Sequence, residues 1–312
     1  MMTSESYYRH IKVEEVSIAC SDGVSLGGHV WHGEGPGPHG CVIINNATGV
    51  LAKYYHRYAR FLAERGFDVL TYDYRGIGAS RPANLAGCKF RWRDWGALDF
   101  EAAIHFMRRR FPGTPIKVVG HSVGGYLPGL AASAAQLDRM LTVGAQYAWF
   151  GDYARNHRVT MFLKWHVIMP LLTAIVGYFP GKRLGWLEDL PAGVAYEWSF
   201  RRPRFEVAYD VTERSEVLSR IGSVTAPILA LSMSDDEFGT PEAIGRTLSY
   251  YTNAKRTIVC LNPKDVGQEK VGHFNLFHDS HSSGFWLDTL VWLRGGVNPW
   301  PNKIARFLQE NP

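Results

Sequence analysis

The pattern of apolar and polar positions near the start of the chain indicates β-hairpins. Two strand-like segments, Val13–Ala19 and Ser25–Trp31, are separated by the turn sequence Ser21-Asp22-Gly23. A loop rich in glycine and proline then leads to Cys41–Asn45, a short continuous apolar run that is typical of a buried strand. The first 45 residues are therefore expected to supply the strands at one side of a sheet.

After this point short apolar runs alternate with amphipathic stretches. Further strands are predicted at Phe67–Tyr72, Ile116–Val119, Met140–Gly144, Pro227–Leu231 and Arg256–Leu261. Helices are predicted at Tyr54–Arg65, Asp94–Arg110, Gly124–Ala135 and Ser282–Arg294. Buried strands that alternate with amphipathic helices predict an α/β fold, in which a mostly parallel sheet is covered by helices on both faces.

One long segment interrupts this alternation. From about Gln146 to Ser219 no strand–helix rhythm is visible, and aromatic residues are concentrated there: Trp149, Phe150, Trp165, Tyr178, Phe179, Trp186, Tyr196, Trp198 and Phe200. A long aromatic and helical insertion between two sheet strands is typical of a lid. We therefore predict a core formed by residues 1–145 and 220–312, with a helical lid at 146–219.

Composition places the chain among ordinary globular proteins. Its 312 residues are 46% hydrophobic and 20% charged, which excludes a disordered, collagen-like or coiled-coil chain. The four cysteines are scattered, with no C-x-x-C pair, so neither a zinc cluster nor a disulfide framework is expected. This cysteine usage is typical of a reducing compartment, and we expect a cytoplasmic protein.

The remaining compositional features indicate neither nucleic-acid binding nor a membrane anchor. The net charge is only +5, and the basic runs Arg108–Arg110 and Arg201–Arg204 lack the context of a nucleic-acid-binding motif. The first ten residues contain no apolar signal region. The longest apolar stretch, Met161–Tyr178, is interrupted by Lys164, His166 and Pro170, so no transmembrane segment is expected.

The strongest chemical signal is the sequence Gly120-His121-Ser122-Val123-Gly124, directly after a predicted strand and before a predicted helix. This is the G-x-S-x-G pattern of a nucleophile elbow, whose sharp turn holds the serine in a strained conformation and requires small residues on either side. The same pattern occurs at Gly23–Gly27, but no helix follows it there. We therefore predict Ser122, and not Ser25, as the nucleophile.

A serine nucleophile needs a base, and the base needs a carboxylate that orients it. In this architecture the acid follows a later sheet strand. Ser232-Met233-Ser234-Asp235-Asp236 follows the predicted strand Pro227–Leu231. Counting from the strand favours Asp236 as the acid, with Asp235 as the alternative; the other aspartate would then be a turn or helix-capping group.

The base is expected in a loop after the last strand. His273, preceded by Gly272, fits that place. His278 and His281 are predicted to lie at the start of the closing helix or on the surface. No H-E-x-x-H pattern accompanies these histidines, so no metal site is predicted.

Acyl transfer also needs hydrogen-bond donors for the oxyanion. One should be the backbone N–H of Val123, the residue after the nucleophile. The second should come from the turn after Cys41–Asn45, where Ala47 is favoured by position and Thr48 is next.

These motifs together resemble the α/β-hydrolase superfamily. They are D-Y-R-G-x-G-x-S at 73–80, G-H-S-x-G-G at 120–125, S-D-D-E at 234–237 and G-H-F at 272–274, in that order. Within the superfamily the chain is similar to bacterial lysophospholipase-like and serine-aminopeptidase (S33-type) hydrolases, over roughly residues 13–295. The resemblance implies an eight-stranded sheet, a Ser122–Asp236–His273 triad and no cofactor. The oxyanion loop departs from it, since it is N-N-A-T-G in place of the common H-G-x motif.

The function expected from these residues is that of a serine hydrolase acting on a carboxylic ester or thioester with a small, fairly apolar acyl group. Serine at the elbow favours ester, thioester or amide chemistry, since dehalogenases and epoxide hydrolases of this fold carry aspartate there. An acyltransferase, a peptidase or amidase, and a catalytically silent receptor of the same fold are the alternatives. The expected partner is a small molecule, and a homodimer is compatible with the sequence.

Overall fold

A computed structural model describes residues 11–35 and 39–305 of the chain. Eight strands form one sheet in the order β1-β2-β4-β3-β5-β6-β9-β10. The pairs β1–β2 and β2–β4 are antiparallel, and the other pairs are parallel. The strands are β1 Val13–Ala19, β2 Ser25–Trp31, β3 Cys41–Asn45, β4 Asp68–Tyr72, β5 Ile116–His121, β6 Arg139–Val143, β9 Ile228–Met233 and β10 Arg256–Leu261. The predicted mostly parallel, eight-stranded sheet is confirmed.

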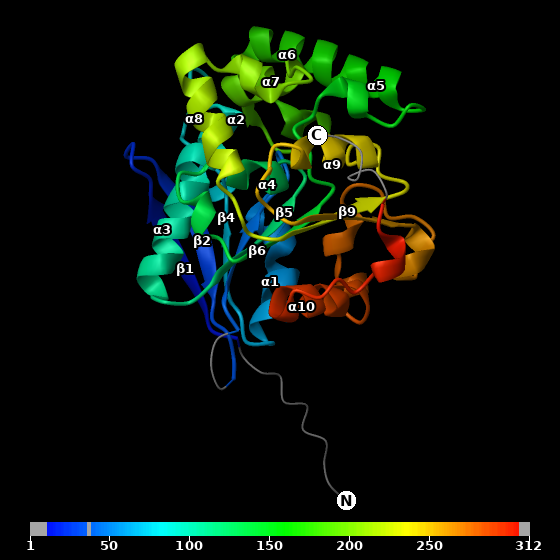
Figure 1. The fold of residues 1–312 in the computed structure, drawn as a ribbon. Helices are drawn as coiled ribbons and strands as arrows, with labels where there is room; N and C mark the ends of the chain where they lie inside the picture. Colours follow the sequence, from blue (N-terminus) through cyan, green and yellow to red (C-terminus); the bar gives the residue numbers. More distant parts are fainter. Residues whose placement is uncertain (1–10, 36–38, 306–312) are drawn as a thin grey trace, which may run out of the picture.

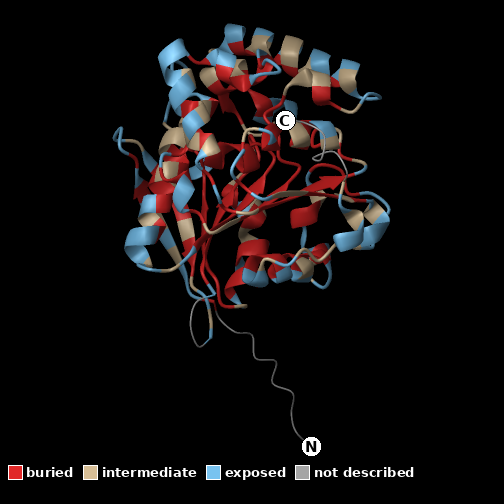
Figure 2. Cartoon of the chain, in the orientation of Figure 1, coloured by how far each residue is buried: buried red, intermediate tan, exposed pale blue. Residues whose placement is uncertain are grey.

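Helices cover both faces of this sheet (Figure 1), because its central strands are apolar on both sides. Successive residues of β3 point to opposite faces, so that Ile43 belongs to one hydrophobic core and Val42 and Ile44 to the other. Figure 2 shows the resulting buried sheet between partly exposed helices.

One core lies under α1 and α10. These helices are α1 His56–Ala63 and α10 Phe285–Gly295, and they contribute Tyr58 and Trp286, whose ring centres are 5.2 Å apart. The closing helix was predicted to begin at Ser282. It begins at Phe285 instead, after a 3-10 turn at Asp279–His281.

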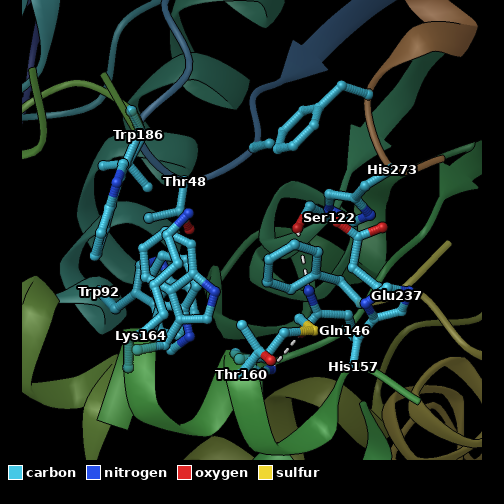
Figure 3. Close-up of a pocket in the computed structure, with 18 residues that line it drawn as sticks. Thr48, Trp92, Ser122, Gln146, His157, Thr160, Lys164, Trp186, Glu237 and His273 are labelled. Carbon is cyan, nitrogen blue, oxygen red and sulfur yellow. Dashed lines mark hydrogen bonds between the residues drawn. The ribbon is translucent and has the colours of Figure 1, made fainter. Parts of the chain in front are cut away.

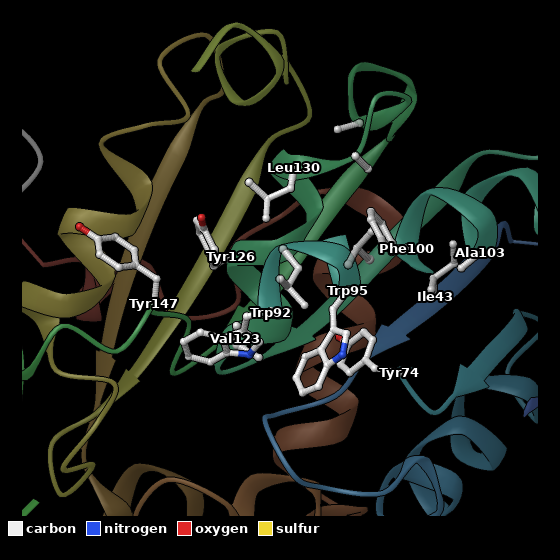
Figure 4. Packing of buried hydrophobic residues seen from close by; sticks show 14 of the residues in the cluster. Ile43, Tyr74, Trp92, Trp95, Phe100, Ala103, Val123, Tyr126, Leu130 and Tyr147 are labelled. Carbon is white, nitrogen blue, oxygen red and sulfur yellow. The ribbon is translucent and has the colours of Figure 1, made fainter. Parts of the chain in front are cut away.

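The opposite core lies under α3, α4, α8 and α9 (Figure 4), where Trp95 stacks on Tyr74 with ring centres 4.6 Å apart. The helices on this face are α2 Trp92–Asp94, the π-helical turn η3 Trp95–Phe100, α3 Glu101–Arg110, α4 Val123–Tyr126, α8 Val211–Gly222 and α9 Pro241–Leu248.

The helix predicted over Gly124–Ala135 is much shorter than expected. Helix α4 ends at Tyr126 and is followed by a 3-10 turn, η4, at Leu127–Leu130. Pro128 lacks an N–H and cannot donate the hydrogen bond to the carbonyl four residues earlier that would continue the α-helix, which explains why the α-helix gives way to a 3-10 turn there.

The segment between β6 and α8, residues 146–210, lies over the carboxyl edge of the sheet (Figure 1), and we call it the cover segment. It contains α5 Arg158–Phe162, the π-helical turn η7 Leu163–Ile168, α6 Met169–Val176, α7 Ala192–Ser199 and the short antiparallel strands β7 Tyr178–Phe179 and β8 Leu190–Pro191. The predicted lid boundary at residue 219 falls inside α8, which packs on η4 of the core.

Residues Arg158–Val176 form one continuous helix of 19 residues, in which an 18-residue window has a mean hydropathy of 1.7 and is 28% buried. By length and composition alone this helix is long and apolar enough to cross a membrane. In the fold it lies along the sheet edge, where Trp165 and Met169 are buried and Val159 and Ile175 are 73% and 80% exposed. One side of the helix is thus built into the protein, and the other is apolar and open.

Candidate active site

Ser122 lies at the turn between β5 and α4 with φ 56° and ψ −127°, a conformation that non-glycine residues rarely adopt. The flanking glycines are required sterically. A Cβ on Gly124 would lie 2.3 Å from the carbonyl oxygen of Asn45, and one on Gly120 would lie 2.5 Å from the carbonyl oxygen of Gly124. This geometry is that of a nucleophile elbow. Ser25, by contrast, begins β2 and contacts the hydroxyl of Ser17 at 2.5 Å.

His273 and Asp236 form a buried pair, with His273 Nδ1 and Asp236 Oδ2 2.7 Å apart. The other carboxylate oxygen of Asp236 accepts hydrogen bonds from the amides of Phe238 and Gly239, each at 2.8 Å. Burial alone would raise the pKa of Asp236, but the imidazole and the two amides outweigh it and hold that pKa below its ordinary value. Asp236 is therefore ionised and acts on His273 as a fixed acceptor.

Asp235, the alternative acid, has a different contact. Its Oδ2 accepts the amide N–H of Val271 at 2.8 Å. Val271 lies in the loop that carries His273, so Asp235 holds this loop while Asp236 contacts the imidazole. The two adjacent carboxylates thus have different partners: Asp235 the Val271 amide, and Asp236 the His273 imidazole.

Ser122 and His273 line the same cavity of about 280 Å³, together with Gln146 (Figure 3). The side-chain amide of Gln146 donates from Nε2 to Ser122 Oγ at 3.2 Å. Its Oε1 accepts the amide N–H of Ala148, a residue with φ 59°, which fixes the orientation of the Gln146 side chain. Sequence reasoning did not identify Gln146; the available signal was its place just beyond the carboxyl end of a sheet strand.

The three residues considered for the oxyanion site are all close to Ser122. Val123 is the first residue of α4, and its N–H has no hydrogen-bond partner within the described residues. Ala47 and Thr48 both line the cavity. The Ala47 amide donates to Tyr55 Oη at 3.0 Å, whereas the Thr48 hydroxyl is buried with no partner in the described part of the chain. The favoured Ala47 amide is thus engaged, whereas the Thr48 amide donates to no acceptor among the described residues.

A second buried histidine, His121, connects Tyr55 to the loop that carries His273. Tyr55 Oη lies 2.7 Å from His121 Nδ1, and His121 Nε2 lies 2.8 Å from the carbonyl oxygen of His273. Because a carbonyl can only accept, Nε2 carries the proton, and Tyr55 donates to Nδ1. Burial, with the neighbouring His273, lowers the pKa of His121 to about 3. The neutral ring therefore links the oxyanion loop to the backbone of the His273 loop.

The other candidate histidines lie elsewhere. His278 is exposed, as predicted. His281 is buried, with both ring nitrogens unpartnered among the described residues, and precedes α10. The expectation that it starts the closing helix or lies on the surface is therefore wrong. Within residues 11–35 and 39–305, no group of three His, Cys, Asp or Glu side chains is arranged to hold a metal ion.

The far wall of the cavity comes mainly from the cover segment and is rich in tryptophan. Trp165 stacks on Trp198 with ring centres 4.5 Å apart, and Trp198 stacks on Trp92 at 5.8 Å. Two charged side chains also line the cavity, Lys164 and Glu237. The cavity is therefore apolar over most of its surface, with a few polar groups at defined places, as in small-molecule sites.

Comparisons with known proteins agree with this fold. Residues 36–262 match the family described as serine aminopeptidase, S33. No curated protein matches the chain. Among solved structures, an esterase of Pyrococcus furiosus is 15% identical with a TM-score of 0.57, over 91% of this chain and 90% of that chain.

Two further structures are similar over nearly their whole length. An esterase domain of a Rhodothermus marinus protein is 16% identical, with a TM-score of 0.57 over 91% of this chain and 99% of that chain. The thioesterase domain of the curacin biosynthetic pathway is 19% identical, with a TM-score of 0.50 over 88% of this chain and 98% of that chain. At these identities the likeness shows a shared fold.

Proposed function

The chain belongs to the S33 serine aminopeptidase family of α/β-hydrolases, and from this premise we propose that it is a serine hydrolase that cleaves carboxylic esters or thioesters through an acyl-enzyme. The observation that carries the proposal is the elbow serine, Ser122, in one cavity with the buried His273–Asp236 pair. The three side chains come from loops after β5, β9 and β10, which the parallel sheet brings to one edge.

In this mechanism His273 takes the proton of Ser122 as the hydroxyl attacks the acyl carbon, and then gives it to the leaving group. Because Nδ1 of His273 contacts Asp236 at 2.7 Å, Nε2 is the nitrogen free to accept the serine proton. Ionised Asp236 fixes this tautomer and stabilises the imidazolium that forms. Water then attacks the acyl-enzyme by the same route, and its proton returns through His273 to Ser122.

The oxyanion is held by the Val123 amide and, in this proposal, by the amide of Thr48. The Ala47 amide donates to Tyr55 in the resting protein, which favours the alternative donor, Thr48, over the first choice. Preorganised backbone donors of this kind are each worth about 10²–10³ in rate.

The cover segment acts as the lid of this site and sets the acyl pocket. A cavity of about 280 Å³ lined by tryptophan is at the small end of ligand sites, which supports a short, fairly apolar acyl group. Two of the similar structures are named esterases and one a thioesterase, which makes esters and thioesters the first substrates to test.

Covalent labelling tests the proposal directly. A fluorophosphonate probe should label the wild-type protein and not Ser122→Ala, and hydrolysis of p-nitrophenyl esters from acetate to palmitate should disappear in the same variant. Ser25→Ala is the matched control, since it removes the other G-x-S-x-G serine and should keep full labelling. Labelling that persists in Ser122→Ala would remove Ser122 as the nucleophile.

The same two measurements, labelling and ester hydrolysis, also distinguish the alternative functions. Labelling without ester hydrolysis would move the proposal to amide or peptide substrates, or to acyl transfer, which added alcohol or thiol acceptors would reveal. A wild-type protein that is neither labelled nor active, yet is stabilised by a ligand, would be a receptor.

A further inference from the structure

Lys164 stands in the cavity wall without a partner for its charge. It lies in the π-helical turn η7, and its Nζ is 4.5 Å from the ring centre of Trp165 and 4.3 Å from that of Trp186. Aromatic faces stabilise an ammonium group but cannot satisfy its three N–H donors in the way that oxygen acceptors do. Within the described part of the chain, Lys164 has no hydrogen-bond or ion-pair partner.

The negative side chain of the same cavity lies elsewhere. Figure 3 shows Lys164 beside Trp92 and Trp186 on one side, and Glu237 with Ser122 and His273 on the other. Burial lowers the pKa of Lys164, and the charge of Glu237 opposes that lowering from a distance. The ammonium has therefore lost water without gaining an anion in contact, which is an incomplete arrangement for a partly buried charge.

The wall around Lys164 has a further unpaired donor. The indole N–H of Trp92 is buried and has no acceptor among the described residues. The stack formed by Trp92, Trp198 and Trp165 supplies flat apolar surface in the same cavity lining, and Lys164 Nζ lies over Trp165 at one end of it. A ligand that fits this wall has an apolar body and an oxygen-rich end.

We propose that Lys164 binds an anionic group at the far end of the acyl chain, so that the preferred substrates are esters or thioesters of short carboxylate-terminated acids. This inference rests on the proposed function, since it assigns the acyl group that Ser122 receives. A single ammonium matches the single charge of a carboxylate, and Glu237 in the same cavity disfavours a doubly charged phosphate. The small volume of the cavity favours a short chain.

The test compares charged and neutral acyl groups of equal length. Substrates are the mono-p-nitrophenyl esters of adipic, pimelic and suberic acids, each paired with the p-nitrophenyl ester of the unsubstituted acid of the same chain length. In Lys164→Met, kcat/KM for the charged ester of best-fitting length should fall about tenfold or more, and for its neutral partner less than about threefold. Lys164→Arg should recover much of the loss. Lys182→Met is the matched control, because Lys182 is 71% exposed and should not discriminate between the pairs.

Equal losses on both esters in Lys164→Met would overturn the proposal, since they would mean that Lys164 only supports the tryptophan wall. A kcat/KM for the charged esters that is the same in Lys164→Met as in the wild type would overturn the proposal as well. A binding measurement on a catalytically inactive variant tests the anion site independently of whether the proposed hydrolase activity exists. Calorimetry with the monomethyl esters of adipic, pimelic and suberic acids, which carry one charge each, should show binding to Ser122→Ala and a loss of about tenfold in Ser122→Ala/Lys164→Met, whether or not the protein turns over any p-nitrophenyl ester. Absence of half-ester binding to both proteins would reject the anion site.

Discussion

The two halves of the cavity are built by different means. On the sheet side, Ser122, Asp236 and His273 stand on turns whose backbone geometry is set by glycines and strand ends. On the cover side, the lining includes Trp165, Trp186, Trp198 and Lys164, and Trp165 of η7 stacks on Trp198 of α7. The sheet side therefore fixes where the reaction occurs, and the cover side decides what fits there. Substitutions should accordingly change turnover on one side and substrate preference on the other.

The largest effect should come from the pair that orients the base. Asp236→Asn keeps the size of the side chain but removes the charge that holds the reactive tautomer of His273, and kcat for a p-nitrophenyl ester should fall by about 10³–10⁴. Asp235→Asn is the matched neighbour. It weakens only the contact to the Val271 amide and should cost less than about tenfold. Equal losses in the two variants would mean that the two carboxylates do not have separate roles.

A smaller effect, on stability, is expected from the backbone of the elbow. Gly124→Ala places a methyl group 2.3 Å from the Asn45 carbonyl oxygen, so the turn must open, at a cost of about 1–3 kcal/mol or more in the free energy of unfolding. Gly245→Ala is the control, because Gly245 lies inside α9 with nothing within 4 Å of the added Cβ. It should raise stability by about 0.5–1 kcal/mol in urea unfolding. A free energy of unfolding that is the same in Gly124→Ala as in the wild type would show that the elbow is not constrained as described.

The third effect is a pH dependence of stability that arises from the buried side chain of His121, next to the loop of His273. The pKa of His121 is lowered to about 3 in the folded protein, so the unfolded chain binds more protons than the folded one below about pH 6.5. This stabilising contribution is complete above that pH and is lost as the pH falls toward 3. It should amount to about 2 kcal/mol between pH 7.5 and pH 5.

Replacing His121 by Gln should remove this part of the acid destabilisation, measured by urea unfolding at the two pH values. His278→Gln, at an exposed position, should leave the dependence as in the wild type. Identical slopes in His121→Gln and wild type would place the acid sensitivity in other groups.

The difference between the two halves also explains what could be predicted from sequence. Strands β1, β2, β3 and β10 have the bounds predicted from the sequence. Strand β3 is a continuous apolar run that is buried throughout, and β1 and β2 are bounded by the turn sequence Ser21-Asp22-Gly23 between them. The pairing of Asp236 with His273 was open between two aspartates, and the order of residues after the strand was enough to favour the one that makes the contact.

Other features depend on contacts that no local pattern carries. Gln146 donates to Ser122 while the Ala148 amide, at a residue with φ 59°, holds the other end of its side-chain amide. The Ala47 amide is engaged because Tyr55, from the following 3-10 turn, points its hydroxyl at it. On the cover side, an excess of aromatic residues predicted a lid but not which of them face Ser122, since that depends on how the helices are rotated.

That rotation depends on the π-helical turn η7. Four buried residues of the Arg158–Val176 helix follow one another at steps of four: Met161, Trp165, Met169 and Thr173. In an ideal α-helix each such step drifts by about 40° around the axis, so this stripe would turn away from the cavity within three steps. The wider turn at Leu163–Ile168 takes up one extra residue and keeps the stripe in line. Regular winding of the full sequence would rotate α6 by about 100°, whereas deleting one residue from this turn would restore regular winding with α6 still in line. One codon gained or lost here can therefore change which side chains line the cavity while α6 and the loops of Ser122, Asp236 and His273 keep their places.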